Sequence, residues 1–301
     1  MRRESFRVNR LILPAAVLLL ASCDPPLRSA ADEVKAPVQP VQTRRDAAPT
    51  PAAPAGTCPA GMVWLPAATF KMGTTEADEE AMPDDMPQHP ATVAAFCMAK
   101  TETTVAQYEA CVAAGSCTAA GAVNYPHCNT GANGRSNHPI NCVDFEQATA
   151  YCQAEGARLP TEEEWEYAAR GVAGRKYPWG WAAPDTTRLN ACDQDCTRLN
   201  VKIDFLYDAS DGWMTTAPVG SFPKGATPEG LLDMAGNVAE WTSSRDCPYP
   251  HKSCAEEKRI TRGGAWDSGM RASVSGSGRT YAGREPSTRS GALGFRCART
   301  P

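Results

Sequence analysis

The segment Gly230–Ser244, GLLDMAGNVAEWTSS, is the part of the sequence around which the rest is organised. It places two acids, Asp233 and Glu240, on either side of a glycine and an asparagine, with Trp241 directly after them. Glycine and asparagine accept backbone conformations that other residues avoid, so the segment predicts a tight backbone path. Both carboxylates could point into that path, and the indole would anchor it. Taken alone, the segment favours an ordinary buried turn, and the motifs in the rest of the chain change that interpretation.

The N-terminal residues have the features of an export signal. Four arginines flank the start of an apolar run, Leu11 to Leu20, that is too short for a mature transmembrane helix. The run ends in Leu20-Ala21-Ser22-Cys23, which resembles the lipobox of bacterial lipoproteins, where the cysteine becomes a lipidated N-terminus. A soluble secreted protein is the alternative. We expect a signal peptide at 1–22, a lipid-anchored Cys23 with an Ala/Pro-rich tether to residue 57, and one folded domain at 58–301 in the bacterial cell envelope, facing the periplasm or the cell surface.

Charge and cysteine usage narrow the function classes. The 301-residue chain has a formal net charge of −4, and no basic tract or array of stacking aromatics stands out, so nucleic acid is not an expected partner. Of the 13 cysteines, 12 remain when Cys23 is set aside, and in an exported protein an even number indicates disulfides more than metal ligation. Close spacing favours the pairs Cys111/Cys117, Cys128/Cys142, Cys192/Cys196 and Cys247/Cys254, with Cys58/Cys97 as a looser possibility.

Periodicity predicts only a modest amount of regular structure. Helices are expected from Thr104, from about Phe145, and from Thr161, where Thr161-Glu162-Glu163-Glu164 forms a capping box. The stretch 171–230 is rich in Gly, Pro, Asp, Asn and Thr, and such long irregular regions are often functional or held by metals and disulfides. Strands are expected at 62–65, 69–72, 91–100, 239–242, 259–266 and 294–298.

Eight motifs occur in one order, and together they resemble the formylglycine-generating enzyme, or sulfatase-modifying factor, family over roughly residues 58–299. The resemblance implies a single α+β domain with little regular secondary structure, disulfide-rich here and related to the C-type lectin fold. The motifs are MVWLPAATFKMG (62–73), KTETTVAQY (100–108), RLPTEEEWEYAARG (158–171), YPWG (177–180), APVGSFP (217–223), Gly230–Ser244, RGGAW (262–266) and LGFRCA (293–298).

The resemblance also implies two structural calcium ions, for which carboxylate and carbonyl oxygens are suitable ligands. One set of matching positions is Asp233, Gly236, Val238 and Glu240; the other is Asn190, Ala191, Asp211 and Trp213. By itself, Asp211-Gly212 would be interpreted as a turn. A family disulfide matches Cys152 and Cys297, whereas a second one has no counterpart because its positions hold Ala169 and Gly278.

The catalytic positions depart from the family pattern. The resemblance implies that active members convert a protein cysteine to formylglycine with oxygen. It also implies that they hold copper(I) with two cysteines, five residues apart, after the RGGAW-type motif. Here both positions are serine, Ser268 and Ser273. A hydroxyl is a harder ligand than a thiolate and stays protonated at neutral pH, so copper is not expected. A nucleophilic Ser268 would need a base, and no histidine lies nearby in the sequence.

Other chemistry has weak support in the sequence. An ergothioneine-type relative uses histidine-bound iron, but the four histidines here are dispersed and form no His-x-x-x-His pair. The stretch 266–289 offers a candidate ligand groove suited to peptide, carboxylate or sugar recognition, with a solvated loop as the alternative. We expect a non-catalytic domain that binds an envelope peptide, protein or glycan; the alternative is an oxidase of protein cysteine with a non-standard site. The groove candidates are Trp266, Arg271, Arg279, Tyr281 and Arg284.

Overall fold

The computed structural model describes residues 56–121, 127–199, 205–250, 254 and 257–301. The expected signal peptide, the lipid attachment at Cys23 and nearly all of the tether lie outside these ranges. No helix in the described part of the chain combines the length and apolar character needed to cross a bilayer.

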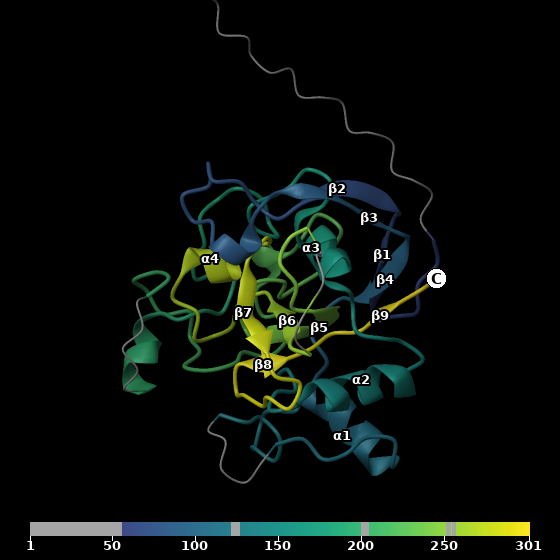
Figure 1. Cartoon of the computed structure of the whole chain (residues 1–301). Helices are drawn as coiled ribbons and strands as arrows, with labels where there is room; N and C mark the ends of the chain where they lie inside the picture. The colour runs from purple at the N-terminus through teal and green to yellow at the C-terminus, as the bar shows by residue number, and fades with distance from the viewer. Residues whose placement is uncertain (1–55, 122–126, 200–204, 251–253, 255–256) are drawn as a thin grey trace, which may run out of the picture. The chain divides into compact units, whose positions relative to one another are not determined.

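Two small sheets are formed by strands from the N-terminal part of the domain, together with one strand from its C-terminal end (Figure 1). β1 (Met62–Leu65), β4 (Phe96–Ala99) and β9 (Ala298–Arg299) form an antiparallel sheet in the order β1-β4-β9. β2 (Ala68–Met72) pairs antiparallel with β3 (His89–Val93), so that Phe70 lies opposite Ala91. The strand expected at 91–100 is therefore two strands, because the chain leaves the β2–β3 pair after Val93 and joins the other sheet at Phe96.

The largest sheet has the order β7-β6-β5-β8 and begins at the end of the segment that opened the sequence analysis. β5 (Ala239–Arg245) pairs antiparallel with β6 (Arg259–Arg262) and parallel with β8 (Leu293–Gly294). The strand expected at 259–266 stops at Arg262, because Gly263 and Gly264 turn with φ values of 98° and 70°. The strand expected at 294–298 is replaced by β8 and β9, which belong to different sheets.

β7 (Arg279–Arg284) is a strand that the sequence did not predict. It pairs antiparallel with β6, placing Arg279 opposite Arg262. Its arginines, glycine and serine-rich flank gave a loop-like composition, whereas pairing with a buried neighbour decides the conformation.

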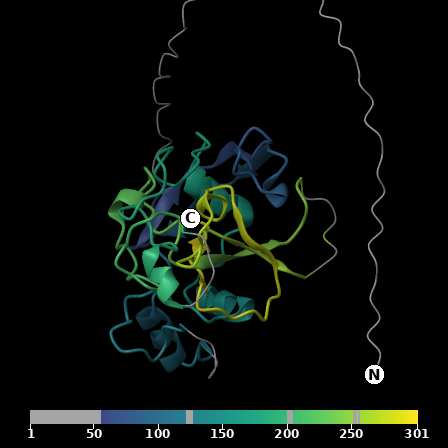
Figure 2. The same cartoon turned by 90° about the vertical axis from the view of Figure 1, so that its left-hand side faces the viewer.

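The helices begin where the sequence predicted. α1 (Val105–Ala113), α2 (Phe145–Ala154) and α3 (Glu162–Arg170) each start with a capping box, at Thr104, Asp144 and Thr161 respectively. Figures 1 and 2 both place α1 and α2 together below the large sheet, away from α3. The remaining short helices are α4 (Arg271–Val274) and the 3-10 turns η1 (Pro83–Asp85), η2 (Gln194–Leu199) and η3 (Pro223–Gly225).

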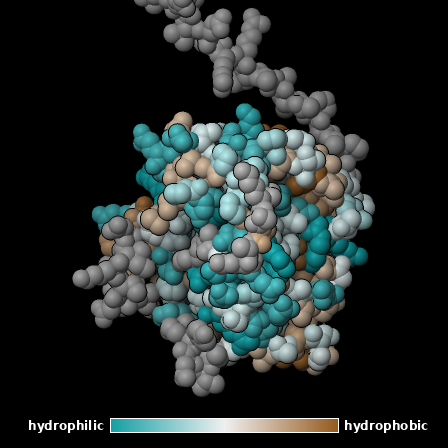
Figure 3. Space-filling view, in the orientation of Figure 1, coloured by the Kyte–Doolittle hydropathy of each residue, from teal (hydrophilic) through white to brown (hydrophobic). Residues whose placement is uncertain are grey.

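Buried aromatic side chains join the sheets to the helices. Trp241 of β5 is fully buried and packs edge-on against Phe145 of α2, and its Nε1 donates to Val143 O at 3.1 Å. Trp165 of α3 is equally buried on the other side, among Leu231 and Met72. The inward orientation predicted for Trp165 is confirmed. Figure 3 shows that the face carrying β7 is mainly hydrophilic, with apolar areas scattered toward its edges.

All the predicted disulfides are present. Cys152–Cys297 fastens α2 to the end of the chain across a sequence separation of 145 residues. The others are Cys58–Cys97, Cys111–Cys117, Cys128–Cys142, Cys192–Cys196 and Cys247–Cys254. Every cysteine in the described part of the chain is therefore paired.

A buried arginine, Arg296, lies where the sheets meet. Its guanidinium forms a two-pronged ion pair with Glu240 of β5, with Nη2–Oε1 at 2.7 Å and Nε–Oε2 at 2.8 Å. It also donates to four backbone carbonyls, those of Ala99 at the end of β4, of Lys100, and of Leu232 and Asp233 in the loop before β5. Trp165 Nε1 donates to the same carboxylate, at 2.8 Å. These bonds connect β4, β5, α3 and the loop before β5 through one fully buried group.

A second buried network lies under α3. Glu162 accepts from Arg262 and Arg279, and Glu166 from Arg262 and Arg170. Burial alone would raise the pKa of Glu162, but the two arginines outweigh that effect and hold its pKa below the usual value. Glu162 therefore stays ionised, which fixes β6 and β7 against the start of α3.

The Arg296–Glu240 pair gives a direct stability prediction. Glu240→Gln should lower the free energy of unfolding by about 3–5 kcal/mol, because it leaves a buried guanidinium without its counter-charge. Glu257→Gln removes one partner of an exposed pair with Arg245 at 3.7 Å and should change stability by less than about 1 kcal/mol. Equilibrium urea unfolding measures both, and equal effects of the two changes would contradict the assigned role of Glu240.

Candidate functional site

The two serines at the family's cysteine positions lie on one loop between β6 and β7. The glycine pair after Arg262 turns the chain, and Ser268 then closes a tight loop in which Ala265 N donates to Ser268 Oγ at 2.9 Å. Ser268 is buried, whereas Ser273 lies in α4, is partly exposed and lines a pocket. Asp267, the acid next to Ser268, lies in a turn.

The Cys192–Cys196 disulfide lies against this loop. Cys192 N donates to Ser268 O at 3.1 Å, and Cys196 Sγ is 3.6 Å from Trp266 O. Sulfur therefore lies next to the backbone of the Trp266–Ser268 part of the loop, but as a buried disulfide that offers no thiolate. Hydroxyl groups at Ser268 and Ser273 cannot replace a thiolate pair as soft ligands or as redox groups.

The structure places two of the five predicted groove residues, Trp266 and Arg279, in the interior. Trp266 is buried, donates from Nε1 to Gly291 O at 3.0 Å and packs edge-on against His127. Arg279 belongs to the interior network, because its side chain is only 1% exposed and its Nε and Nη2 donate to Glu162. Arg271 is the groove candidate that is open to solvent, with 51% side-chain exposure and a 3.7 Å contact with Glu80.

The last two groove candidates belong to β7. Tyr281 is described only as a strand residue, and Arg284 is partly buried at the strand's end. Strand pairing with β6 accounts for the difference from the prediction, because it replaces an open loop with a packed edge.

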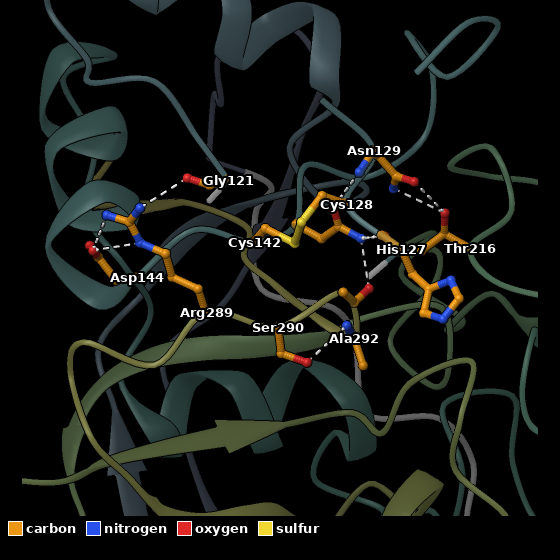
Figure 4. Close-up of a disulfide and its surroundings, with 12 residues drawn as sticks. Gly121, His127, Cys128, Asn129, Cys142, Asp144, Thr216, Arg289, Ser290 and Ala292 are labelled. Carbon is orange, nitrogen blue, oxygen red and sulfur yellow. Dashed lines mark hydrogen bonds and ion pairs between the residues drawn. A yellow bond between two sulfur atoms is a disulfide. The ribbon is translucent and has the colours of Figure 1, made fainter. Parts of the chain in front are cut away.

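Hydrogen bonds around the Cys128–Cys142 disulfide support the Trp266 side of the loop, and Figure 4 shows this disulfide and its surroundings. Asn141 Nδ2 donates to His127 O and to Gly291 O, the carbonyl that also accepts from Trp266. In Figure 4 the Cys128–Cys142 disulfide lies at the centre, and the Arg289–Asp144 ion pair, with Nη2–Oδ2 at 2.7 Å, lies to its left. The loop is thus rigidly supported although its thiol positions are serine.

The second predicted calcium set comes together in the structure. Asp211 Oδ2 accepts from Ala191 N at 3.2 Å, across 20 positions of sequence, and its Oδ1 accepts from Trp213 N at 2.9 Å. Burial raises the pKa of Asp211 to about 6, and Asp193 adds to the effect. Asn190 Oδ1 is buried and has no hydrogen-bond partner. An unpaired amide oxygen beside a destabilised carboxylate fits a calcium ion.

The first predicted set fits calcium only in part. Glu240 is already held by Arg296 and Trp165. Asp233 is buried, and Glu102, a buried neighbour that the sequence analysis did not select, has a free Oε2. Burial first, and then the charge of Asp233, raise the pKa of Glu102 well above its usual value.

In this first set the carboxyl groups of Glu102, Asp233 and Glu240 lie near one guanidinium, that of Arg296, so acidic groups outnumber the basic one. Glu102 was not among the predicted ligands, so the oxygen donors differ from the predicted set. Gly236 is required here for close packing, because a Cβ would lie 2.1 Å from Asn190 O. Val238 is fully buried at the entrance to β5. Among the described residues, no group of three or more His, Cys, Asp or Glu side chains has metal-holding geometry. Calcium in either set would depend mainly on backbone and amide oxygens.

Sequence comparison finds relatives named as formylglycine-generating enzymes. Over 180 residues the chain is 39% identical to the formylglycine-generating enzyme of Streptomyces coelicolor, covering 55% of this chain and 54% of that protein. It is 38% identical over 164 residues to inactive C-alpha-formylglycine-generating enzyme 2 of Bos taurus, covering 53% and 50%. The chain spans about half the length of these curated relatives.

Solved structures match over more of the domain. PvdO from Pseudomonas aeruginosa superposes with a TM-score of 0.62 at 29% identity, covering 80% of this chain and 94% of that one. Treponema denticola variable protein 1, at 20% identity and a TM-score of 0.56, shares the fold. The sulfatase-modifying factor enzyme 1-like domain matches residues 47–301. The chain therefore belongs to the sulfatase-modifying factor enzyme 1-like domain family.

Proposed function

We propose that this protein is a lipid-anchored envelope protein whose domain binds a peptide, protein or glycan and does not make formylglycine. The observation that carries the proposal is the serine at both family cysteine positions, Ser268 and Ser273, on a loop that is otherwise intact. All cysteines in the described ranges are paired, so no thiolate pair replaces the missing one. The name of the cattle relative, which calls that protein inactive, is consistent with this proposal.

Retention of the shell without the thiols fits a binding role. The buried ion pairs and disulfides that hold the Ser268 loop do not involve either serine side chain. The fold can therefore persist after the redox centre is lost, and its loops remain available for a partner. The competing function is an oxidase of protein cysteine with a non-standard site, supported by the 39% identity to the Streptomyces enzyme.

An activity assay separates these two functions. The purified protein, supplied with copper(I), oxygen and a cysteine-containing peptide, should yield no aldehyde by mass spectrometry, because neither serine supplies a soft thiolate. The Streptomyces coelicolor relative under identical conditions serves as the positive control. Detection of formylglycine with the present protein would reject the binding function.

Calcium in the second set is part of the proposal, with Asn190 and Asp211 as side-chain ligands and the Ala191 and Trp213 carbonyls completing the site. Chelator should lower the melting temperature, since an ion at 100 times its Kd contributes about 2.7 kcal/mol to the folded state. Asp211→Asn keeps the size of the side chain but removes its charge, so its melting temperature should no longer respond to calcium. Identical wild-type melting curves with calcium and with chelator would refute the site.

The lipid anchor is tested through Cys23. Cys23→Ser in the full-length chain, expressed in a bacterium with a lipoprotein pathway, should move the protein from the membrane fraction to the soluble fraction and abolish labelling by a radioactive fatty acid. Wild-type protein that is soluble and unlabelled would contradict the anchor without affecting the binding function.

A further inference from the structure

A small pocket opens between η1 and α4, beside the start of β7, where Figure 1 shows the blue chain around η1 next to α4. Its volume is about 290 Å³, which suits one side chain better than a large ligand. Two methionines line it and are well exposed, Met82 at 41% and Met270 at 57%. Ala272, Ser273 and Gly278 also line it.

The lining carries negative charge. Asp84 is partly buried and Asp85 is 1% exposed, and both line the pocket. Arg279 also contributes to the lining, but its guanidinium is turned to Glu162 and to Cys247 O. Its charge is therefore already compensated, and it is not available to the two aspartates.

Asp85 is a buried carboxyl without a cation of its own. Its Oδ1 accepts from Arg279 N at 2.9 Å, and its backbone O accepts from Thr74 N, so the residue is firmly placed. No arginine, lysine or histidine of the described residues forms an ion pair with it. Since a buried carboxylate is costly without a counter-charge, the site has an electrostatic preference for a cation.

We propose that this pocket binds the side chain of a lysine on a partner peptide, with the methylenes against Met82 and Met270 and the ammonium at Asp84 and Asp85. This inference rests on the proposed binding function of the domain and names one subsite of it. A lysine fits better than an arginine, because the Arg279 N–H already occupies one oxygen of Asp85 and spoils the two-oxygen face that a planar guanidinium needs. The Ser273 hydroxyl can accept a further hydrogen bond from the ammonium.

The charge of Asp85 makes the binding pH-dependent. The pKa of Asp85 is raised to about 6, mainly by burial; the Arg279 N–H and the nearby Arg262 oppose the rise in pKa, and the charge of Asp84 adds to it. Asp85 is therefore mostly ionised at pH 7.5 and mostly protonated at pH 5. Affinity for a cation should fall as the pH decreases through about 6.

The experiment titrates the folded protein with two matched probes, Nα-acetyl-lysine amide and the uncharged Nα-acetyl-norleucine amide, and follows binding by NMR. At pH 7.5 the lysine probe should bind at least about tenfold more tightly, the effect of one charge-assisted hydrogen bond. At pH 5 the preference should shrink. Nα-acetyl-arginine amide should bind more weakly than the lysine probe.

Variants separate charge from shape. Asp85→Asn and Asp84→Asn should each reduce the lysine preference, whereas Met270→Ala should weaken both probes alike. Asp185→Asn, a charge removed from an exposed pair with Arg188, is the control and should leave binding unchanged. If Asp85→Asn does not fold, Asp84→Asn and the pH series still test the proposal.

Equal affinity for the lysine and norleucine probes, or no binding of the lysine probe, would overturn the proposal. Failure here is distinguishable from failure of the proposed function. Loss of the lysine preference without any aldehyde product removes only the subsite, whereas aldehyde formation removes the non-catalytic function and leaves a lysine-selective pocket standing.

Discussion

The fold depends on one fully buried guanidinium, that of Arg296. It pairs with Glu240 and donates hydrogen bonds to backbone carbonyls of two separate segments, at Ala99 and Lys100 and at Leu232 and Asp233. A buried charge is tolerated only when its hydrogen bonds are nearly all satisfied, so each of these segments must be in place for the others to be stable. This requirement compensates for the short strands and helices of the domain, which bury little surface individually.

The same constraint explains why the site loop survives its substitutions. Arg262 at the end of β6 is held by Glu162 and Glu166, and the chain then turns at Gly263 toward Ser268. On its other side the loop is fixed through Trp266 and the carbonyl of Gly291. These bonds do not use the side chain at position 268 or 273, and the Ser268 hydroxyl adds one more by accepting from Ala265 N. Serine at the two positions therefore removes the soft ligands without removing the support. A scaffold of this kind can change function by changing its loop residues.

The buried acids also decide which arginines lie in the interior, a question that the sequence left open. Arg279 and Arg296 look alike in composition to Arg271, yet only Arg271 reaches solvent. A buried acid, Glu162 or Glu240, selects the arginine that it pairs with, and that selection depends on strand register. Beside α4, Asp84, Asp85 and two methionines line the pocket that we propose as a subsite for a cation.

The sequence by itself determined the family, the capped starts of α1, α2 and α3, and the disulfides, since these depend on local spacing and on motifs in a fixed order. It also located Ser268 and Ser273, because a motif position survives a change of residue. Only the tertiary structure decided that β7 is a strand, that Trp266 and Arg279 are interior, and that Asp85 and Glu102 are buried acids. The physical reason is that the buried hydrogen bonds of Arg296 join residues 56 to 197 positions apart, and no local pattern records which charges will meet.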